Sequence, residues 1–122
     1  MIPFNKPFII GEEMAYVQDA LVRGKISGNG HYTRQCQAFF EERYGFGKAL
    51  LTTSCTDALE MSALLLNLQP GDEVILPGYT FVSTANAFAL RGAQLVFVDS
   101  EASFPNMDVA AVEAAITPRT RA

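Results

Sequence analysis

The sequence predicts an α/β protein with a mainly parallel sheet. Short apolar segments typical of strands lie at residues 49–52, 74–77 and 94–99. Helical patterns of about ten residues follow them at 57–67, 81–90 and 107–116. This alternation is typical of βαβ units, whose strands are parallel. The length of 122 residues, 49% of them hydrophobic, suits one domain with a buried core.

Residues 1–45 lie outside that alternation. Pro3 and Pro7 predict an extended arm over residues 1–13, because proline restricts its own φ and the residue before it. Apolar residues near helical spacing predict a helix over 12–23. The run GKISGNG, residues 24–30, predicts a loop, because glycine permits tight turns. A second helix is expected from Tyr32 to Tyr44, with Gly45 as its C-cap.

The remaining elements follow from local patterns. Three segments are predicted to be strands: ALLT (49–52), VILP (74–77) and QLVFVD (94–99). The turn PGDE precedes the second strand, and RGA ends the helix before the third. After the last helical pattern, TPRTRA (117–122) stands where the alternation requires another strand. The chain is therefore expected to be the first third of a larger protein, since three parallel strands leave an unprotected edge.

Composition excludes several classes of function. The net charge of −4, with lysine and arginine scattered, excludes a nucleic-acid footprint. No apolar run approaches the ~20 residues of a spanning helix, and the stretch MIPFNKPFIIGEE lacks the basic, apolar and small-residue regions typical of a secretory leader. A single histidine, His31, and two cysteines 19 residues apart, Cys36 and Cys55, predict neither a metal site nor a disulfide framework. A cytoplasmic protein without membrane insertion is expected.

Three turns are predicted to meet at the carboxyl edge of the sheet, where open parallel sheets bind ligands. They are TSCTD (53–57), PGYTF (77–81) and the segment after Asp99. The N–H groups of a helix start favour an anion, and Phe81 or Tyr79 could pack against a flat ring. An anion at the first turn and a flat ring against one of these aromatics would together describe a phosphorylated aromatic cofactor, although the pattern alone favours helix capping.

Two other interpretations of these turns remain open. Ser54-x-x-Asp57 is nearly a capping box and Thr80 could cap the next helix, so the hydroxyl groups could serve helix ends alone. Alternatively, Cys55 at a helix start could act as a nucleophile, although its base would have to come from elsewhere. Neither a dinucleotide fingerprint nor a P-loop occurs in the sequence.

The run TSCTDALEMSALLLNLQPGDEVILPGYTFVSTANAFALRGAQLVFVD resembles the DegT/DnrJ/EryC1 family of sugar aminotransferases. The resemblance extends through IPFNKPFIIGEE and GKISGNGHYTRQC at one end and EAAITPRTRA at the other. It implies a fold-type I enzyme that uses pyridoxal 5'-phosphate, with a three-layer α/β/α large domain. Residues 1–31 would form an arm, a helix and the glycine loop, and residues 32–122 the incomplete first part of that domain.

The resemblance also implies roles for particular residues. The N–H groups of Cys55, Thr56 and Asp57, with the Thr56 hydroxyl, would hold the cofactor phosphate, and Phe81 would stack on the pyridine ring. Gly28 and Asn29 would lie near a substrate site shared across a homodimer. The segment SEASFP (100–105) departs from the family pattern, which has Pro and Thr there, and we expect this to alter a surface loop.

The details SGNGHYTRQCQ and SCTDALEMSALLL resemble members that make dTDP-4-amino-4,6-dideoxygalactose for enterobacterial common antigen, and they imply a role in this synthesis and in lipopolysaccharide biosynthesis. The resemblance then implies amino transfer from glutamate to the 4-keto carbon of dTDP-4-keto-6-deoxyglucose. No catalytic residue is assigned, because the Schiff-base lysine is expected beyond residue 122 and the lysines present match neither family position. This chain alone is expected to be inactive. Another nucleotide keto sugar, or a non-catalytic binding or dimerisation module, remains an alternative.

Overall fold

A computed structural model describes residues 2–122, and these residues form two units. The first unit runs to Leu51, and the second runs from Thr52 to Ala122. Each unit is described by itself. No helix within residues 2–122 is long and apolar enough to cross a membrane.

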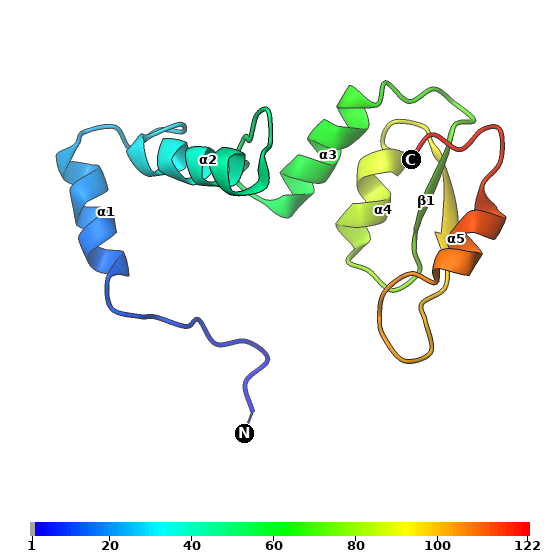
Figure 1. Ribbon diagram of the computed structural model, residues 1–122, viewed down its shortest axis with the longest axis horizontal. Coiled ribbons are helices and arrows are strands. Elements are labelled where there is room, and N and C mark those ends of the chain that lie inside the picture. The colour runs from blue at the N-terminus through cyan, green and yellow to red at the C-terminus, as the bar shows by residue number, and fades with distance from the viewer. Residues whose placement is uncertain (1) are drawn as a thin grey trace. The chain divides into compact units, whose positions relative to one another are not determined.

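The first unit contains the two helices predicted for it. Helix α1 (Glu13–Val22) follows an arm without regular structure, and helix α2 (His31–Tyr44) follows the glycine loop (Figure 1). Both helices agree with the prediction to within one residue at each end. Gly45 has a φ of 69°, so the predicted left-handed C-cap is confirmed, and glycine adopts this conformation without strain.

One polar contact joins α1 to α2. The Tyr32 hydroxyl donates to the Asp19 carboxylate at 2.7 Å, and Arg23 donates to the same carboxylate from one turn along α1. The Arg23 guanidinium and then the Tyr32 hydroxyl hold the pKa of Asp19 below its ordinary value. The ring of Tyr16 meets the ring of Tyr32 edge to face at 5.3 Å between centroids. These contacts fix the register of the two helices around the glycine loop.

The strand predicted at residues 49–52 is wrong. This segment has no regular structure, and Leu50 remains 67% exposed. The Glu41 carboxylate of α2 accepts a hydrogen bond from the Ala49 N–H at 3.0 Å and an ion pair from Lys48 at 2.7 Å, so the segment is attached to α2. A strand needs a neighbouring strand for its backbone groups, and this segment pairs with none among the described residues.

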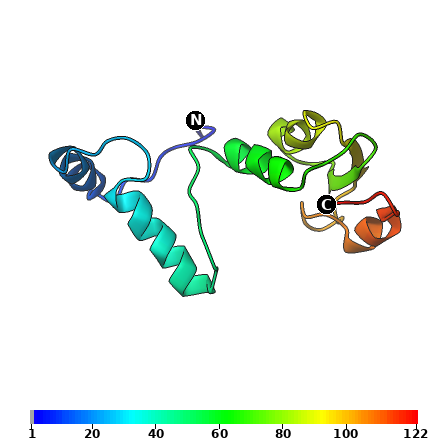
Figure 2. The same ribbon diagram turned by 90° about the horizontal axis from the view of Figure 1, so that it is seen from above.

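The second unit is built on two parallel strands. Strand β1 (Glu73–Pro77) pairs with strand β2 (Gln94–Val98) in the register that sets Ile75 opposite Val96. Helix α4 (Val82–Ala89) connects them and packs on both strands, while helix α5 (Val109–Ala115) packs on β2. Figures 1 and 2 show the strands between α4 and α5. This is the α/β/α layering that the sequence predicts.

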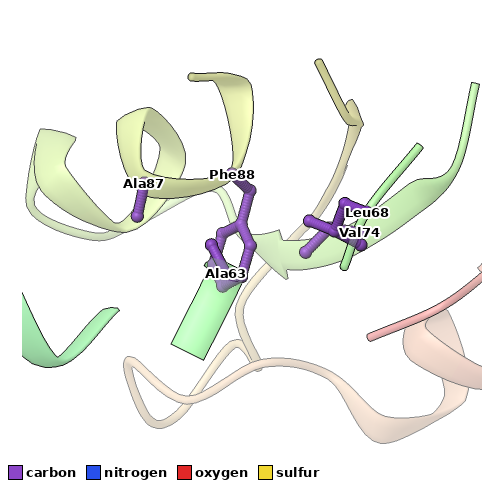
Figure 3. Close-up of a cluster of buried hydrophobic side chains, with 5 residues drawn as sticks. All are labelled: Ala63, Leu68, Val74, Ala87 and Phe88. Carbon is purple, nitrogen blue, oxygen red and sulfur yellow. The ribbon is translucent and has the colours of Figure 1, made fainter. Parts of the chain in front are cut away.

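Helix α3 (Cys55–Leu65) completes the second unit by packing on α4. Figure 3 shows the buried cluster that joins these elements: Ala63 of α3, Leu68 and Val74 before and within β1, and Ala87 and Phe88 of α4. Ala63 is fully buried, and its small side chain allows α3 to approach Phe88 closely. The α3 helix begins and ends two residues earlier than predicted.

The final residues of the chain lie along the free edge of β1. The Glu73 N–H donates to the Arg119 carbonyl at 2.9 Å, and the Arg121 N–H donates to the Glu73 carbonyl at 2.8 Å. Thr120 therefore forms a parallel bridge with Glu73. The buried Glu73 carboxylate accepts hydrogen bonds from the Thr117 hydroxyl at 2.5 Å and from Arg119 Nε at 2.9 Å. These contacts place residues 119–122 where the alternation required a further strand.

Candidate cofactor-binding site

The carboxyl ends of β1 and β2 and the amino ends of α3 and α4 lie at one side of the second unit (Figure 1). The strands are parallel and each helix runs antiparallel to the strand it covers, so the turns at this side converge. Two of the three predicted turns, at residues 53–57 and 77–81, end in a helix start. The third turn follows Asp99 and leads toward α5.

Ser54 is the N-cap of α3. Its backbone is extended, with φ −153° and ψ 163°, and its hydroxyl oxygen accepts a hydrogen bond from the Asp57 N–H at 3.1 Å. The Thr52 hydroxyl donates to the Ser54 carbonyl at 2.7 Å and supports that conformation. The capping interpretation of Ser54-x-x-Asp57 is therefore confirmed for the serine. The Asp57 N–H, one of the predicted phosphate donors, is already used by the cap.

The Asp57 carboxylate turns back toward the preceding residues. It accepts a hydrogen bond from the Thr53 hydroxyl, and this bond, followed by the contact with Ser54, lowers the pKa of Asp57 below its ordinary value. The carboxylate is thus held as an anion in the first turn of α3, where the helix dipole favours negative charge. Its hydrogen bond to Thr53 ties it to the turn itself.

Cys55 and Thr56 supply the donors that remain available at this helix start. Within residues 2–122, neither their N–H groups nor the Thr56 hydroxyl donates a hydrogen bond. Unpaired N–H groups in the first turn of a helix are suited to an anion, and α3 has 11 residues to contribute to the dipole. The residues present therefore fit a phosphate group. The Cys55 thiol is exposed and not in a disulfide.

Phe81 is placed by the start of α4. Phe81 itself, and not Thr80, is the N-cap residue, so the predicted cap at Thr80 is wrong. Phe81 provides no side-chain cap, while the Thr80 hydroxyl lies 2.9 Å from the Thr84 hydroxyl and is satisfied there. The Phe81 ring is 73% exposed within this chain. A ring so exposed is free to stack on a flat ligand.

A hollow of about 430 Å³ lies at the third turn. It is lined by Tyr79 and by residues 99–105, which include the atypical segment SEASFP. The Asp108 N–H donates to the Asp99 carbonyl at 3.0 Å and closes this loop at its base. Cys55, Thr56 and Phe81 do not line this hollow. The structure thus brings the predicted residues to one side of the sheet without enclosing them in a common pocket.

The two predicted substrate residues lie in the first unit. Gly28 and Asn29 are both exposed in the loop before α2. Asn29 adopts a positive φ of 56°, which asparagine tolerates better than most residues, and its carbonyl accepts a hydrogen bond from Arg34 at 3.2 Å. The loop therefore has a defined conformation that turns the chain into α2.

The sequence analysis missed one buried charge, Glu73. It was assigned to a turn, but it begins β1, and its side chain is 3% exposed beside Arg119. A carboxylate at the head of an apolar run is a usable signal, because a buried charge requires a partner. The arginine that satisfies it lies 46 residues later and could not be assigned to it from sequence spacing.

Comparison with known proteins identifies this arrangement. The fold is that of the sugar aminotransferases of fold type I. The chain belongs to the DegT/DnrJ/EryC1/StrS aminotransferase family, which it matches over residues 7–122.

Solved structures agree with this membership. The aminotransferase TlmJ from Streptoalloteichus hindustanus is 35% identical, with a TM-score of 0.84 over 98% of this chain. Spr1654 from Streptococcus pneumoniae, in its PLP form, is 34% identical, with a TM-score of 0.80 over 98% of this chain. DesV from S. venezuelae is 34% identical, with a TM-score of 0.75 over 89% of this chain. This chain spans 33%, 30% and 30% of their respective lengths.

These similarities confirm three of the sequence predictions: the family, the fold-type I α/β architecture and pyridoxal 5'-phosphate as the family's cofactor. The last of these rests on Spr1654, which is known in forms with pyridoxal phosphate and with pyridoxamine phosphate.

Proposed function

We propose that the intact protein is a pyridoxal-phosphate-dependent aminotransferase that acts on a nucleotide-linked keto sugar. The observation that carries this proposal is the pair of unpaired N–H groups at Cys55 and Thr56, at the same sheet edge as the exposed ring of Phe81. A phosphate and a pyridine ring together match these two features. Family membership supplies the class of reaction.

Each residue then has a defined part in holding the cofactor. The N–H groups of Cys55 and Thr56 and the Thr56 hydroxyl donate to the phosphate, and the α3 dipole adds to their attraction. The Asp57 N–H joins them only by exchanging its bond to Ser54 for one to the phosphate. Phe81 covers one face of the ring and excludes water from it. Bound pyridoxal phosphate supplies the electron sink for amino transfer.

We further propose the substrate and the assembly. The intact enzyme takes an amino group from glutamate and places it on the 4-keto carbon of dTDP-4-keto-6-deoxyglucose, in enterobacterial common antigen synthesis. It works as a cytoplasmic homodimer, with Gly28 and Asn29 near a substrate site that both subunits share. Residues 1–31 serve as an arm, helix and loop, residues 32–122 begin the large domain, and the catalytic lysine lies beyond residue 122. The motifs SGNGHYTRQCQ and SCTDALEMSALLL support this finer assignment.

A cofactor titration tests the proposal. Phe81→Ala removes the stacking ring, and Tyr79→Ala serves as the matched control, because Tyr79 is an equally exposed aromatic, at 76%, two residues away. Stacking beyond burial contributes about 0.5–1.5 kcal/mol, so Phe81→Ala should weaken pyridoxal phosphate binding by about 2- to 12-fold. Tyr79→Ala should leave the dissociation constant within about twofold. The measurement is the visible absorbance of the intact protein against added cofactor.

The outcome separates the proposal from its alternatives. If Phe81→Ala binds pyridoxal phosphate as tightly as the unmodified protein does, Phe81 does not contact the cofactor. Absence of any cofactor band in the intact protein would favour a non-catalytic binding or dimerisation module. If the cofactor binds, a panel of 4-keto and 3-keto nucleotide sugars with glutamate identifies the substrate. Preference for another keto sugar would refute the substrate assignment but retain the reaction class.

A further inference from the structure

A second candidate site lies in the first unit, independent of the cofactor residues. A pocket of about 540 Å³ is formed by α1, the glycine loop and the first turn of α2. Its volume falls in the range typical of small-molecule pockets. One wall is apolar and includes Val17, Leu21 and Ile26. All the lining residues belong to the same unit.

The charge of this pocket is opposite to that of the chain. Arg23, Lys25 and Arg34 line it, and no aspartate or glutamate does, although the chain has 13 acidic residues and a net charge of −4. Asp19 does not line the pocket and pairs with Arg23. Lys25 and Arg34 form no ion pair within residues 2–122. Two cationic side chains are thus left without a carboxylate partner at the pocket.

The backbone holds this lining in place. Gly30 forms part of the pocket, and a Cβ added there would come within 3.3 Å of the Lys25 carbonyl oxygen. The loop therefore folds back on itself more closely than a larger residue would allow without a shift. Arg34 donates to the Asn29 carbonyl at 3.2 Å, which orients its guanidinium toward the loop while leaving other N–H groups free. The cations are attached to a loop of defined shape.

We propose that this pocket binds the diphosphate group of a ligand. Arginine and lysine are the side chains that bind phosphate oxygens best, and two cations without carboxylate partners suit two linked phosphates. The apolar wall accepts an uncharged part of the same ligand. The proposal stands on the pocket itself. If the proposed function is correct, the nucleotide sugar is the source of the diphosphate.

Calorimetric titration of the intact protein with inorganic pyrophosphate tests the pocket. The double variant Lys25→Gln with Arg34→Gln should weaken binding about tenfold or more, because charge-assisted hydrogen bonds are lost. The matched control, Lys6→Gln with Arg91→Gln, changes the net charge equally at two exposed positions outside the pocket and should change affinity less than about twofold. Lys25→Arg with Arg34→Lys should retain binding.

Equal weakening in the pocket variant and the control would overturn the proposal, as would the absence of pyrophosphate binding to the unmodified protein. A parallel titration with dTDP identifies the source. If the pocket variant binds both dTDP and pyrophosphate more weakly than the unmodified protein does, the site takes a nucleotide diphosphate. If only pyrophosphate binding is weakened, the site takes a smaller anion. Cofactor absorbance, followed in the same samples, reports on Cys55, Thr56 and Phe81. Loss of the cofactor band would therefore count against the proposed function, while loss of pyrophosphate binding would count against the pocket.

Discussion

Ser54 and Thr56 lie two residues apart but have different predicted roles, and two substitutions distinguish those roles. Ser54→Ala removes the oxygen that accepts from the Asp57 N–H at 3.1 Å. Loss of an N-cap of this kind costs about 1 kcal/mol of stability, within a range of about 0.5–2 kcal/mol. Thr56→Val removes a hydroxyl that makes no hydrogen bond within residues 2–122 and keeps the side-chain shape. Its effect on stability should stay within about 0.5 kcal/mol.

The two substitutions should have the opposite order of effect on cofactor affinity. The Thr56 hydroxyl is proposed to donate to the phosphate, and a hydrogen bond to a charged group contributes about 1.5–3 kcal/mol. Thr56→Val should therefore weaken pyridoxal phosphate binding about tenfold or more. Ser54→Ala should not weaken it, because the substitution frees the Asp57 N–H for the phosphate.

Urea unfolding of the cofactor-free intact protein, followed by far-ultraviolet circular dichroism, measures the first effect. Cofactor titration of the same variants measures the second. With a urea m-value of about 2 kcal/mol/M, the lost cap should lower the midpoint by about 0.5 M. The reasoning is refuted if Thr56→Val lowers the midpoint as much as Ser54→Ala while leaving cofactor affinity unchanged. In that case the hydroxyl groups of this turn would serve the helix alone.

Two further predictions concern charge and chemistry. The Thr117 hydroxyl, and then Arg119, lower the pKa of Glu73, so its stabilising contribution is present above the ordinary glutamate pKa of about 4.3 and is lost as the pH falls through the lower folded value. Melting temperatures from pH 3 to 7 should show less acid sensitivity for Glu73→Gln than for the unmodified protein, and equal sensitivity would contradict this assignment. Cys55→Ala keeps the N–H groups that hold the phosphate, and amino transfer by the intact protein should stay within about twofold. A loss of activity of a hundredfold or more would instead support a thiol nucleophile.

Local patterns sufficed for most of the secondary structure. Helix α2 and its end at Gly45 followed from apolar spacing and from a glycine that adopts a positive φ. The cap at Ser54 followed from a hydroxyl placed three residues before Asp57. These features depend on atoms within one or two turns of the chain, so a short stretch of sequence is enough to determine them.

The family resemblance in the sequence named the residues proposed for the cofactor site. The unpaired N–H groups at Cys55 and Thr56 are available where the resemblance implied. The sequence did not predict which other residues lie beside these N–H groups. The hollow at the third turn is lined by Tyr79 and residues 99–105, and neither Cys55 nor Thr56 lines it. Where loops of different strands lie depends on the sheet that carries them, which no single turn encodes.

The family, the α/β class and the helices follow from the sequence, together with the caps at Ser54 and Gly45 but not the cap expected at Thr80. Only the folded arrangement shows that residues 49–52 pair with no strand within residues 2–122, whereas the mostly polar residues 119–122 lie along the free edge of β1. It also paired Glu73 with Arg119 and gathered Lys25 and Arg34 around one pocket. The physical reason is common to all three, because strand pairing, buried charge and pocket lining depend on groups that are distant in sequence and meet only when the chain is folded.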